Sequence, residues 1–335
     1  AAGGAADSGA GAGAGAGCHI TKSTGCDKIS AKFLKDAAST ITAPIAYIIN
    51  LSLSTSTVPV DFKTARVVPL YKKGDKNSEG NYRPVSILPV ISKFFERVVY
   101  NQLCTYLNEH DLIYDFQSGF RQSYSTDSAL TYLSDRIRLN MDAGLYTGIV
   151  LIDLQKAFDT VDHQILISKL KSLGINRSAC SWFESYLSER QQFVNVNGSQ
   201  SVSGEVTCGV PQGSILGPLL FTIYVNDMVR AVKCELLLYA DDSALVVGGR
   251  DPAQIESQLS HELESLSIWL EENKLSLHFG KTESVLFASK KRLSDVNKLS
   301  LKCNDVNIES KKSVKYLGMV LDQDMSGSTM GTSVI

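Results

Sequence analysis

The chain has 335 residues, of which 44% are hydrophobic and 20% are charged, and its formal net charge is −2. This length and apolar fraction can bury a large core and form more than one lobe, and the small net charge excludes a protein that is basic throughout. The charge is unevenly placed, because residues 61–97 carry a local charge of +4 against −6 for the remainder. A basic part and an acidic part suit a protein that holds phosphates with one and divalent cations with the other, although chance surface charge is a fair alternative.

The sequence gives no sign of export or of a membrane anchor. Its apolar runs are far shorter than the roughly 20 residues that cross a bilayer. Residues 1–17 are almost entirely Ala and Gly and lack the features of a secretory signal, so we interpret them as a disordered leader. The seven cysteines are scattered without paired C-x-x-C spacing, which argues against a zinc site or a disulfide framework and favours a reducing intracellular compartment.

Hydrophobic periodicity predicts the elements of the first half of the chain. Apolar residues at helical spacing predict helices over 41–53 and 90–107. Residues 64–71 are typical of a strand, and a polar turn follows over 72–80. The short apolar run 148–154 predicts a strand that is buried on both faces.

The second half continues with helices and strands in alternation. The expected elements are a helix over 163–173 closed by Gly174, a helix over 216–228, a hairpin over 236–247, a helix over 255–270 with Asp251 as its N-cap, and a strand over 275–279 that returns at 285–287. This order predicts an α+β fold in which an antiparallel sheet carries helices on one face.

Three acidic residues indicate the chemistry. Asp153 ends the strand over 148–154, and Asp241 and Asp242 occupy the tip of the hairpin. Carboxylates gathered at adjoining strand ends repel one another unless cations lie between them. Two Mg²⁺ ions, with Mn²⁺ as a possible substitute, would bind such oxygen ligands and would suit phosphoryl transfer. An Asp-Asp pair in a hairpin tip is also a common turn with no further role.

Several motifs carry a resemblance to a known family. Residues 151–163 (LIDLQKAFDTVDH) resemble the first palm motif of reverse transcriptases from non-LTR, LINE-type retrotransposons, with jockey-like elements the nearest in character. Residues 239–242 (YADD) resemble the catalytic hairpin of that family. The other matching motifs are two in the fingers (81–86 and 116–121), one that supports template and nucleotide (209–221), one with a lysine near the pyrophosphate (280–283) and the primer grip (316–318).

The resemblance covers about residues 26–322 in the order of the family and implies a right-hand polymerase. Its palm would be an antiparallel sheet backed by helices, its fingers would be helical, and its thumb would be largely missing. The implied segments are the leader (1–17), the fingers (18–90), the first part of the palm (91–162), a connection between fingers and palm (163–208), the second part of the palm with the catalytic hairpin and primer grip (209–318) and a truncated start of the thumb (319–335).

The resemblance also implies residue roles. Metal ligands would be Asp153, Asp241 and Asp242, with Lys281 as a proton donor to the leaving pyrophosphate. Nucleotide contacts would come from Lys72, Arg83, Leu154, Phe158 and Gln212. Primer and template contacts would come from Arg121, Gly213, Tyr239, Tyr316, Leu317 and Gly318. Alternatively, Lys72 and Lys281 are ordinary loop lysines without a catalytic role, and Phe158 only packs in the core.

The function implied by the resemblance is RNA-directed DNA synthesis. The partners would be an RNA template, a DNA primer and deoxynucleoside triphosphates, with no membrane and no evident protein partner. The location would be intracellular, in the nucleus and cytoplasm as a ribonucleoprotein with the RNA of the element, and not secreted. Viral RNA polymerases are a rival class, but the bulky Phe158 would exclude a 2′-hydroxyl. A group II intron or telomerase-type enzyme, or an inactive relic that only binds nucleic acid, are further alternatives.

Overall fold

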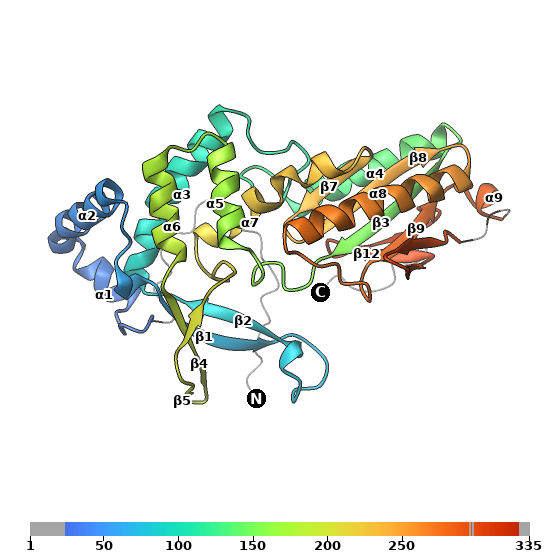
Figure 1. The fold of residues 1–335 in the computed structure, drawn as a ribbon. Helices are drawn as coiled ribbons and strands as arrows, with labels where there is room; N and C mark the ends of the chain where they lie inside the picture. Colours follow the sequence, from blue (N-terminus) through green and yellow to red (C-terminus); the bar gives the residue numbers. More distant parts are fainter. Residues whose placement is uncertain (1–23, 295, 297, 328–335) are drawn as a thin grey trace.

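The computed structural model describes residues 24–294, 296 and 298–327 (Figure 1). The leader predicted over 1–17 lies outside the described residues. A six-stranded and a five-stranded β-sheet lie apart in the molecule, a two-stranded sheet lies beside the first, and a separate group of helices stands above the five-stranded sheet in the view of Figure 1. None of the described helices combines the length and the apolar character that crossing a membrane requires.

The central sheet has six strands and holds the predicted catalytic hairpin. Its spatial order is β10 (Leu301–Cys303), β11 (Val306–Ser310), β9 (Glu283–Phe287), β3 (Tyr146–Asp153), β8 (Asp242–Gly249) and β7 (Glu235–Tyr239). Neighbouring strands run antiparallel, except that β11 runs parallel to β9. The predicted strand over 148–154 and the predicted hairpin over 236–247 are therefore confirmed.

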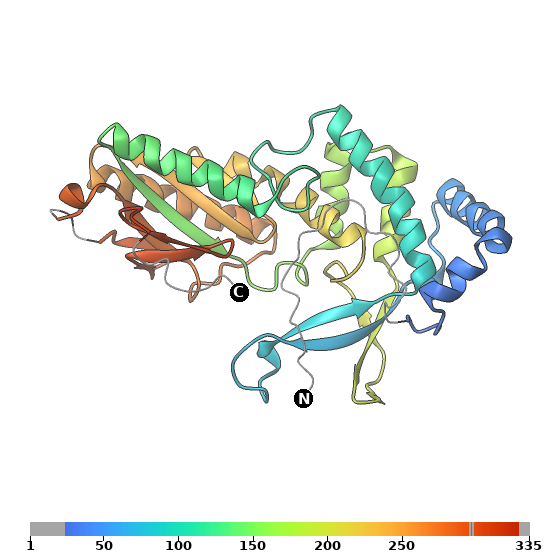
Figure 2. The ribbon, with the colours of Figure 1, turned by 180° about the vertical axis from the view of Figure 1, so that it is seen from behind.

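Both faces of the central sheet are covered, so the prediction of helices on one face was wrong. Helix α8 (Pro252–Glu272) covers one face, and α4 (Thr126–Asp142) covers the other together with the hairpin of β12 (Ser313–Tyr316) and β13 (Met319–Asp322) (Figures 1 and 2). Helix α4 was not predicted from the sequence, because its buried apolar residues are few and polar residues separate them.

Alternate residues of β3 supply the two cores. Val150 and Ile152 pack in the cluster that contains the apolar face of α8, whereas Ile149 and Leu151 pack in the cluster that contains α4. Successive side chains of a strand point to opposite faces, so a continuous apolar run is what a strand between two layers requires. Gly148 allows α8 to approach closely, since a Cβ there would lie 2.3 Å from Cγ2 of Ile255.

The second sheet lies apart from the first and includes the predicted strand over 64–71. Its members are β1 (Thr64–Tyr71), β2 (Tyr82–Ile87), β4 (Arg190–Val196), β5 (Ser199–Gln200) and β6 (Gly204–Val206). Strand β1 pairs antiparallel with β2 and parallel with β4. The basic segment over residues 61–97 thus contributes both strands of the β1–β2 hairpin, which extends from the body of the molecule (Figure 1).

Most of the remaining helices form a group beside the sheets (Figure 1). They are α1 (Ala31–Asp36), α2 (Ala38–Thr55), α3 (Val90–Glu109), α5 (His163–Ser172), α6 (Arg177–Leu187) and α7 (Leu216–Val225), with a short α9 (Lys290–Leu293) beyond the central sheet. The helices predicted over 41–53, 90–107, 163–173 and 255–270 are confirmed. The helix predicted over 216–228 ends earlier, because the chain turns into a 3₁₀-helix, η3 (Asn226–Ala231).

The strand predicted over 275–279 was wrong. Leu275 and Leu277 are buried, as their alternation suggested, but this segment makes only an isolated bridge between Leu277 and Leu154. The returning strand β9 pairs with β3 instead. The alternation therefore reported burial of an irregular segment and not the pairing of a hairpin.

Gly148 offers a test of the packing between β3 and α8. Gly148→Ala would force Ile255 and Leu259 to move within a close-packed core, so we expect a loss of about 1–3 kcal/mol in the free energy of unfolding, measured by urea titration. Gly204→Ala is the matched control, because a Cβ there meets nothing within 4 Å. Equal stabilities for the two variants would contradict the close approach.

Candidate active site

The register of the central sheet brings the predicted acidic residues together. Asp153, the last residue of β3, is the direct partner of Asp242, the first residue of β8. Residues paired in this way have Cα atoms about 4.5–5.5 Å apart. Asp241 lies in the two-residue turn between β7 and β8, next to Ala240. One end of the sheet thus carries three neighbouring carboxyl groups.

The charges at this end of the sheet interact. Partial burial of the Asp242 carboxyl, followed by the negative charges of Asp241 and Asp153, raises its pKa to about 6, although the residue keeps contact with solvent. Lys72 and Lys281 oppose this increase in pKa. The folded chain therefore disfavours the ionised form of Asp242 unless a further positive charge is near.

Lys281 already lies against the acidic group. Its Nζ is 3.0 Å from Oδ1 of Asp153. The turn that holds it is anchored to the same residue, because the backbone N–H of His278 donates to the carbonyl oxygen of Asp153 at 2.8 Å and that of Lys281 donates to the carbonyl oxygen of His278 at 2.9 Å. This geometry places Lys281 beside the acidic group, and its role at the leaving pyrophosphate stays a prediction.

The described residues hold no group of three or more His, Cys, Asp or Glu side chains that already surrounds a single ion position. The donor set still fits a hard divalent cation. Asp153 and Asp242 face each other across two strands, Asp241 adjoins them, and all their donors are carboxylate oxygens, which such ions prefer. The pKa of Asp242 is raised first by partial burial and then by the charges of Asp241 and Asp153, and a bound cation would oppose this increase.

A loop over residues 116–121 supports the turn at Ala240. The N–H of Ser118 donates to the carbonyl oxygen of Leu238 at 2.8 Å, and Gln117, which is fully buried, accepts from the N–H of Gly119 with its side chain. A Cβ at Gly119 would lie 2.2 Å from the backbone nitrogen of Ala240, so only glycine permits this contact. Ala240 itself has a φ of 57°, a conformation that a non-glycine residue adopts at a cost of about 1–3 kcal/mol.

Phe158 and Gln212 come together although 54 residues separate them in the chain. The N–H of Val210 donates to the carbonyl oxygen of Phe158 at 2.8 Å, and Nε2 of Gln212 donates to Oδ1 of Asp159 at 2.8 Å. The Phe158 ring is half-buried and stacks on Phe221 with centroids 4.6 Å apart. Core packing therefore accounts for one face of this ring, as the alternative interpretation expected.

The side chains of Leu154 and Tyr316 are both buried; the contact predicted at Leu154 is one of the main chain after Asp153 and stays a prediction. The Leu154 side chain is buried in the core, and the next N–H, that of Gln155, already donates to Ser276. Tyr316 is only 3% exposed, and burial followed by the charge of Asp242 raises its pKa. A primer contact through the Tyr316 side chain is incompatible with this burial. Within the predicted primer grip, Leu317 and Gly318 form the turn after β12.

Other predicted residues lie on neighbouring elements at different depths. Lys72 and Arg83 are exposed on the β1–β2 hairpin, and Tyr239 is half-buried opposite Asp242. Gly213 has a φ of 116° and lies against β2, where a Cβ would come within 2.6 Å of the carbonyl oxygen of Ser86.

A groove of about 810 Å³ opens beside this region, between α3, α7 and the loop that follows residue 113. It is lined by Arg97 and Arg121 and by the aromatic rings of Tyr100, Phe120 and Tyr124, and its lining includes no Asp or Glu. The Arg121 guanidinium lies over the Tyr124 ring at 4.6 Å. Phe120 continues toward the site, because its ring meets the edge of Phe158 at 6.0 Å.

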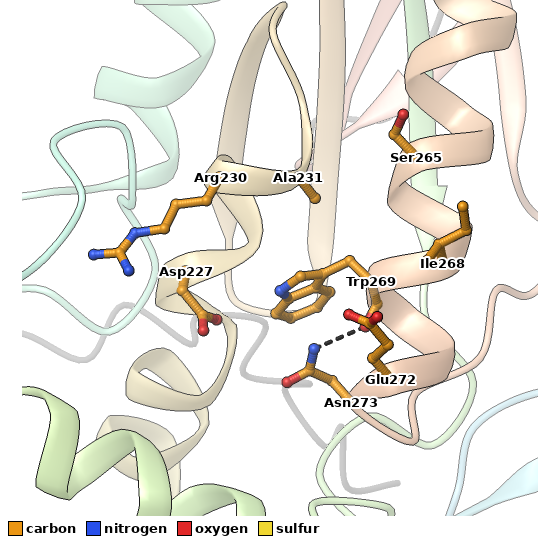
Figure 3. Close-up of a pocket in the computed structure, with 8 residues that line it drawn as sticks. All are labelled: Asp227, Arg230, Ala231, Ser265, Ile268, Trp269, Glu272 and Asn273. Atoms are coloured by element: carbon orange, nitrogen blue, oxygen red, sulfur yellow. Dashed lines mark hydrogen bonds between the residues drawn. The ribbon is translucent and has the colours of Figure 1, made fainter.

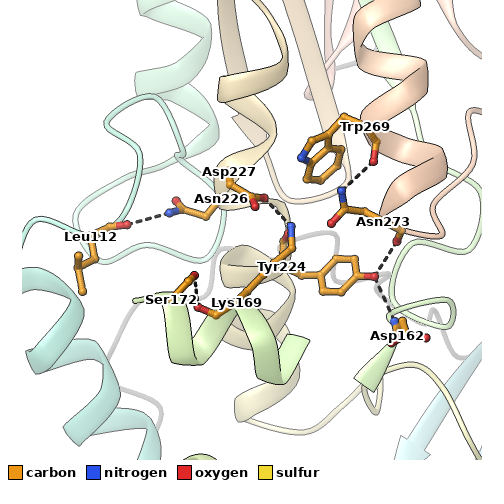
Figure 4. A network of polar contacts seen from close by, with 9 residues as sticks. All are labelled: Leu112, Asp162, Lys169, Ser172, Tyr224, Asn226, Asp227, Trp269 and Asn273. Carbon is orange, nitrogen blue, oxygen red and sulfur yellow. Dashed lines mark hydrogen bonds and ion pairs between the residues drawn. The ribbon is translucent and has the colours of Figure 1, made fainter. Parts of the chain in front are cut away.

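A second cavity, of about 470 Å³, holds none of the predicted residues (Figure 3). Below it, Lys169 of α5 pairs with Asp227 and donates to the carbonyl oxygen of Tyr224 (Figure 4). The Tyr224 hydroxyl donates to the carbonyl oxygen of Asn273 at 2.6 Å (Figure 4). These contacts join α5, α7 and the end of α8, so we interpret the network as structural.

Sequence reasoning missed Asp159, Gln117 and Gly119. Asp159 belongs to the first palm motif, but only the fold shows that it holds the Gln212 amide. Gln117 and Gly119 belong to a predicted fingers motif, and nothing in their spacing reveals contact with a turn about 120 residues later.

Known proteins resemble this chain in sequence and in fold. The sequence family described as "Reverse transcriptase (RNA-dependent DNA polymerase)" matches residues 71–321. The "Probable RNA-directed DNA polymerase from transposon BS" of Drosophila melanogaster is 33% identical over 92% of this chain and 34% of its own length. The "RNA-directed DNA polymerase from mobile element jockey" of the same species is 31% identical over 87% of this chain and 32% of its own length. The chain spans about a third of the length of these curated relatives.

Among solved structures, an apo telomerase from Candida tropicalis truncated from its C-terminal domain has a TM-score of 0.53 with 12% identity. The match covers 80% of this chain and 55% of that protein. This similarity confirms the predicted α+β, right-hand polymerase fold. The sequence relatives confirm the predicted resemblance to non-LTR retrotransposons of the jockey type.

The raised pKa of Asp242 predicts a pH-dependent stability. Ionisation of Asp242 costs more in the folded chain than in the unfolded chain, so its contribution is present below about pH 4 and is lost as the pH rises through about 6. We expect Asp242→Asn to raise the Tm of the metal-free protein by roughly 1–4 °C near pH 7.5 and to have no such effect near pH 4.

Asp305→Asn, in an exposed turn, is the control and should change the Tm at neither pH. Thermal melts in the presence of a chelator measure the effect. If the Tm of Asp242→Asn is lower than that of the native chain near pH 7.5, folding does not disfavour the ionised form of Asp242 and the prediction is wrong.

Proposed function

The chain belongs to the reverse transcriptase family, and from that premise we propose that it catalyses RNA-directed DNA synthesis, adding deoxynucleotides to a primer 3′-hydroxyl and releasing pyrophosphate. The observation that carries the proposal is the direct pairing of Asp153 with Asp242, beside Asp241, at one end of the central sheet. In phosphoryl transfer, catalysis is mostly positioning and electrostatic stabilisation, which a rigid group of carboxylates is suited to provide.

We propose Mg²⁺ as the physiological cofactor, in two sites, with Mn²⁺ as a possible substitute. Asp153, Asp241 and Asp242 would hold the ions. Bound ions would supply the positive charge that stabilises the attacking and leaving oxygens. Lys281 is within reach of the same carboxylates and would carry the proton or the positive charge that the departing pyrophosphate requires.

The exposed cations of the β1–β2 hairpin would bind the triphosphate. Lys72 lies close enough to influence the pKa of Asp242, and Arg83 is on the neighbouring strand. Guanidinium and ammonium groups are the usual ligands of phosphate oxygens. The hairpin and the regions linked to it would form the fingers, and the central sheet with its two layers would form the palm.

The groove beside the site is suited to a single nucleic-acid strand. Its two arginines suit a phosphate backbone, its three aromatic rings suit stacked bases, and the lining brings no carboxylate that would repel phosphates. Because Phe120 links the groove to Phe158, a template strand bound there would lead toward the acidic group. An intracellular ribonucleoprotein with the RNA of the element is the setting that we propose for this reaction.

Loss of one carboxylate tests the catalytic role. Asp241→Asn should lower Mg²⁺-dependent primer extension on an RNA template by about a thousandfold or more, because a neutral amide holds a divalent ion poorly. Asp305→Asn should extend at the native rate. If neither the native chain nor the variants extend a primer with any divalent ion, the alternative of an inactive relic is favoured.

The ring of Phe158 tests the selection of sugar. Phe158→Val should raise the incorporation of ribonucleotides relative to deoxyribonucleotides by about tenfold or more, since the smaller side chain leaves space for a 2′-hydroxyl. The ratio of the two kcat/KM values measures the effect. Phe120→Val removes the neighbouring ring and should leave the ratio unchanged; an unchanged ratio in Phe158→Val would refute the assignment.

A further inference from the structure

A buried carboxyl group lies outside the acidic site. Glu96, in the middle of α3, is only 2% exposed. It accepts hydrogen bonds from the Tyr186 hydroxyl at 3.1 Å, from the backbone N–H of Leu216 at 3.4 Å and from the backbone N–H of Ile215. Burial raises the pKa of Glu96, and the hydrogen bond from Ile215 and the charge of Arg190 oppose that increase.

The two backbone donors belong to the start of α7. The first N–H groups of a helix have no partner within the helix and need an acceptor from elsewhere. Ile215, the N-cap residue, offers no side-chain cap. Ser214 accepts the N–H of Gly217 at 2.8 Å, and Glu96 accepts those of Ile215 and Leu216. A carboxylate from another helix thus caps α7, where negative charge is also favoured by the helix dipole.

The residues just before α7 form the loop over 209–214, which carries Gln212 and Gly213. This loop is attached on its other sides as well. The N–H of Ser86 donates to the carbonyl oxygen of Gln212 at 2.7 Å, and the Gln212 side chain donates to Asp159. Ser214 and Ile215 also line the groove. A shift at the start of α7 would therefore move both the groove wall and the Gln212 amide.

Two further buried groups hold Glu96 in place. Arg190 is 2% exposed, its Nη1 donates to the carbonyl oxygen of Tyr186 at 3.0 Å, and its guanidinium lies over the Tyr186 ring at 4.9 Å. Removing one member of a buried charged group leaves the other unpaired, which is strongly destabilising. The cluster of Glu96, Tyr186 and Arg190 thus ties the start of α7 to α6 and β4.

We propose that Glu96 is a positioning residue for substrate binding: by capping α7 it fixes the loop over 209–214, and with it the placement of the nucleotide and the template strand. Glu96 touches no substrate and acts through Ile215 and Leu216. The inference rests on the proposed function, since it assumes that the loop contacts these substrates.

Four variants separate positioning from stability. Glu96→Leu removes both acceptor oxygens. Glu96→Gln keeps one oxygen that can accept from the N–H groups of Ile215 and Leu216, and its amide NH2 can donate to the hydroxyl oxygen of Tyr186. Tyr224→Phe is the matched control, because it deletes the two hydrogen bonds of the Tyr224 hydroxyl in the buried network of Figure 4, near the C-terminal end of α7 and so at the opposite end from Ile215 and Leu216. Tyr186→Phe, which deletes the hydroxyl that donates to Glu96 and also hydrogen-bonds the Ser214 side chain, is the substitute if Glu96→Leu does not fold.

The readouts are the KM for deoxynucleotide, kcat, the Kd for a primer–template duplex measured without catalysis, and hydrogen exchange of the amides of Ile215 and Leu216. We expect Glu96→Leu to raise KM and Kd about tenfold, to change kcat by less than about threefold and to speed exchange at both amides. Glu96→Gln should stay near the native values, and Tyr186→Phe should show a smaller shift in the same direction. Tyr224→Phe should lower the Tm and leave KM and Kd unchanged.

Faster exchange with native KM and Kd in Glu96→Leu, or in Tyr186→Phe if it replaces that variant, would overturn the inference, because Glu96 would then stabilise the fold only. Equal shifts in KM for the Glu96 variant and Tyr224→Phe would overturn it also. If the native chain fails to extend primers, the proposed function falls, and the comparison of Kd values and exchange rates still decides the role of Glu96.

Discussion

The pairing register of β3 and β8 is the constraint on which the rest of the structure depends, because it holds carboxyl groups that repel one another at one end of the central sheet. Asp153 and Asp242 face each other because β3 and β8 pair in one register. A shift of one residue would turn every side chain of β3 to the opposite layer. Both layers are apolar, so each face of β3 opposes such a shift. The two cores therefore hold an arrangement of charges that is unfavourable by itself.

This dependence explains which parts of the fold the sequence could predict. The strand β3 and the hairpin of β7 and β8 were predictable, because a continuous apolar run and a paired Asp in a turn are local signals. Helix α4 was not, since its few apolar residues form a narrow stripe that is informative only beside a sheet. The error at residues 275–279 has a related cause: alternation reports burial, and an irregular segment between two layers is buried in the same pattern.

The site divides in the same way. The acidic residues and the glycine-rich loop were found from short motifs, whereas the contacts that hold them come from distant segments. Gly119 lies against Ala240, Asp159 holds Gln212, and neither contact has a spacing that a sequence could show. Tyr316 is the opposite case, because its motif suggested contact with a primer, yet its ring fills the core beneath the hairpin. A motif gives a residue's neighbourhood, and only packing decides which of its atoms remain free to bind.

The buried cluster around Glu96 connects these observations across the molecule. Arg190 begins β4, which pairs with β1, and β1 ends at Tyr71, next to Lys72. The same Arg190 holds Tyr186, which donates to Glu96, which caps α7. Lys72, which influences the pKa of Asp242, and the loop over 209–214, which carries Gln212, are thus attached to one framework. Because a rigid framework transmits displacement, a displacement of the β1–β2 hairpin would be transmitted to the loop over 209–214, which is also attached to β2 directly through the N–H of Ser86.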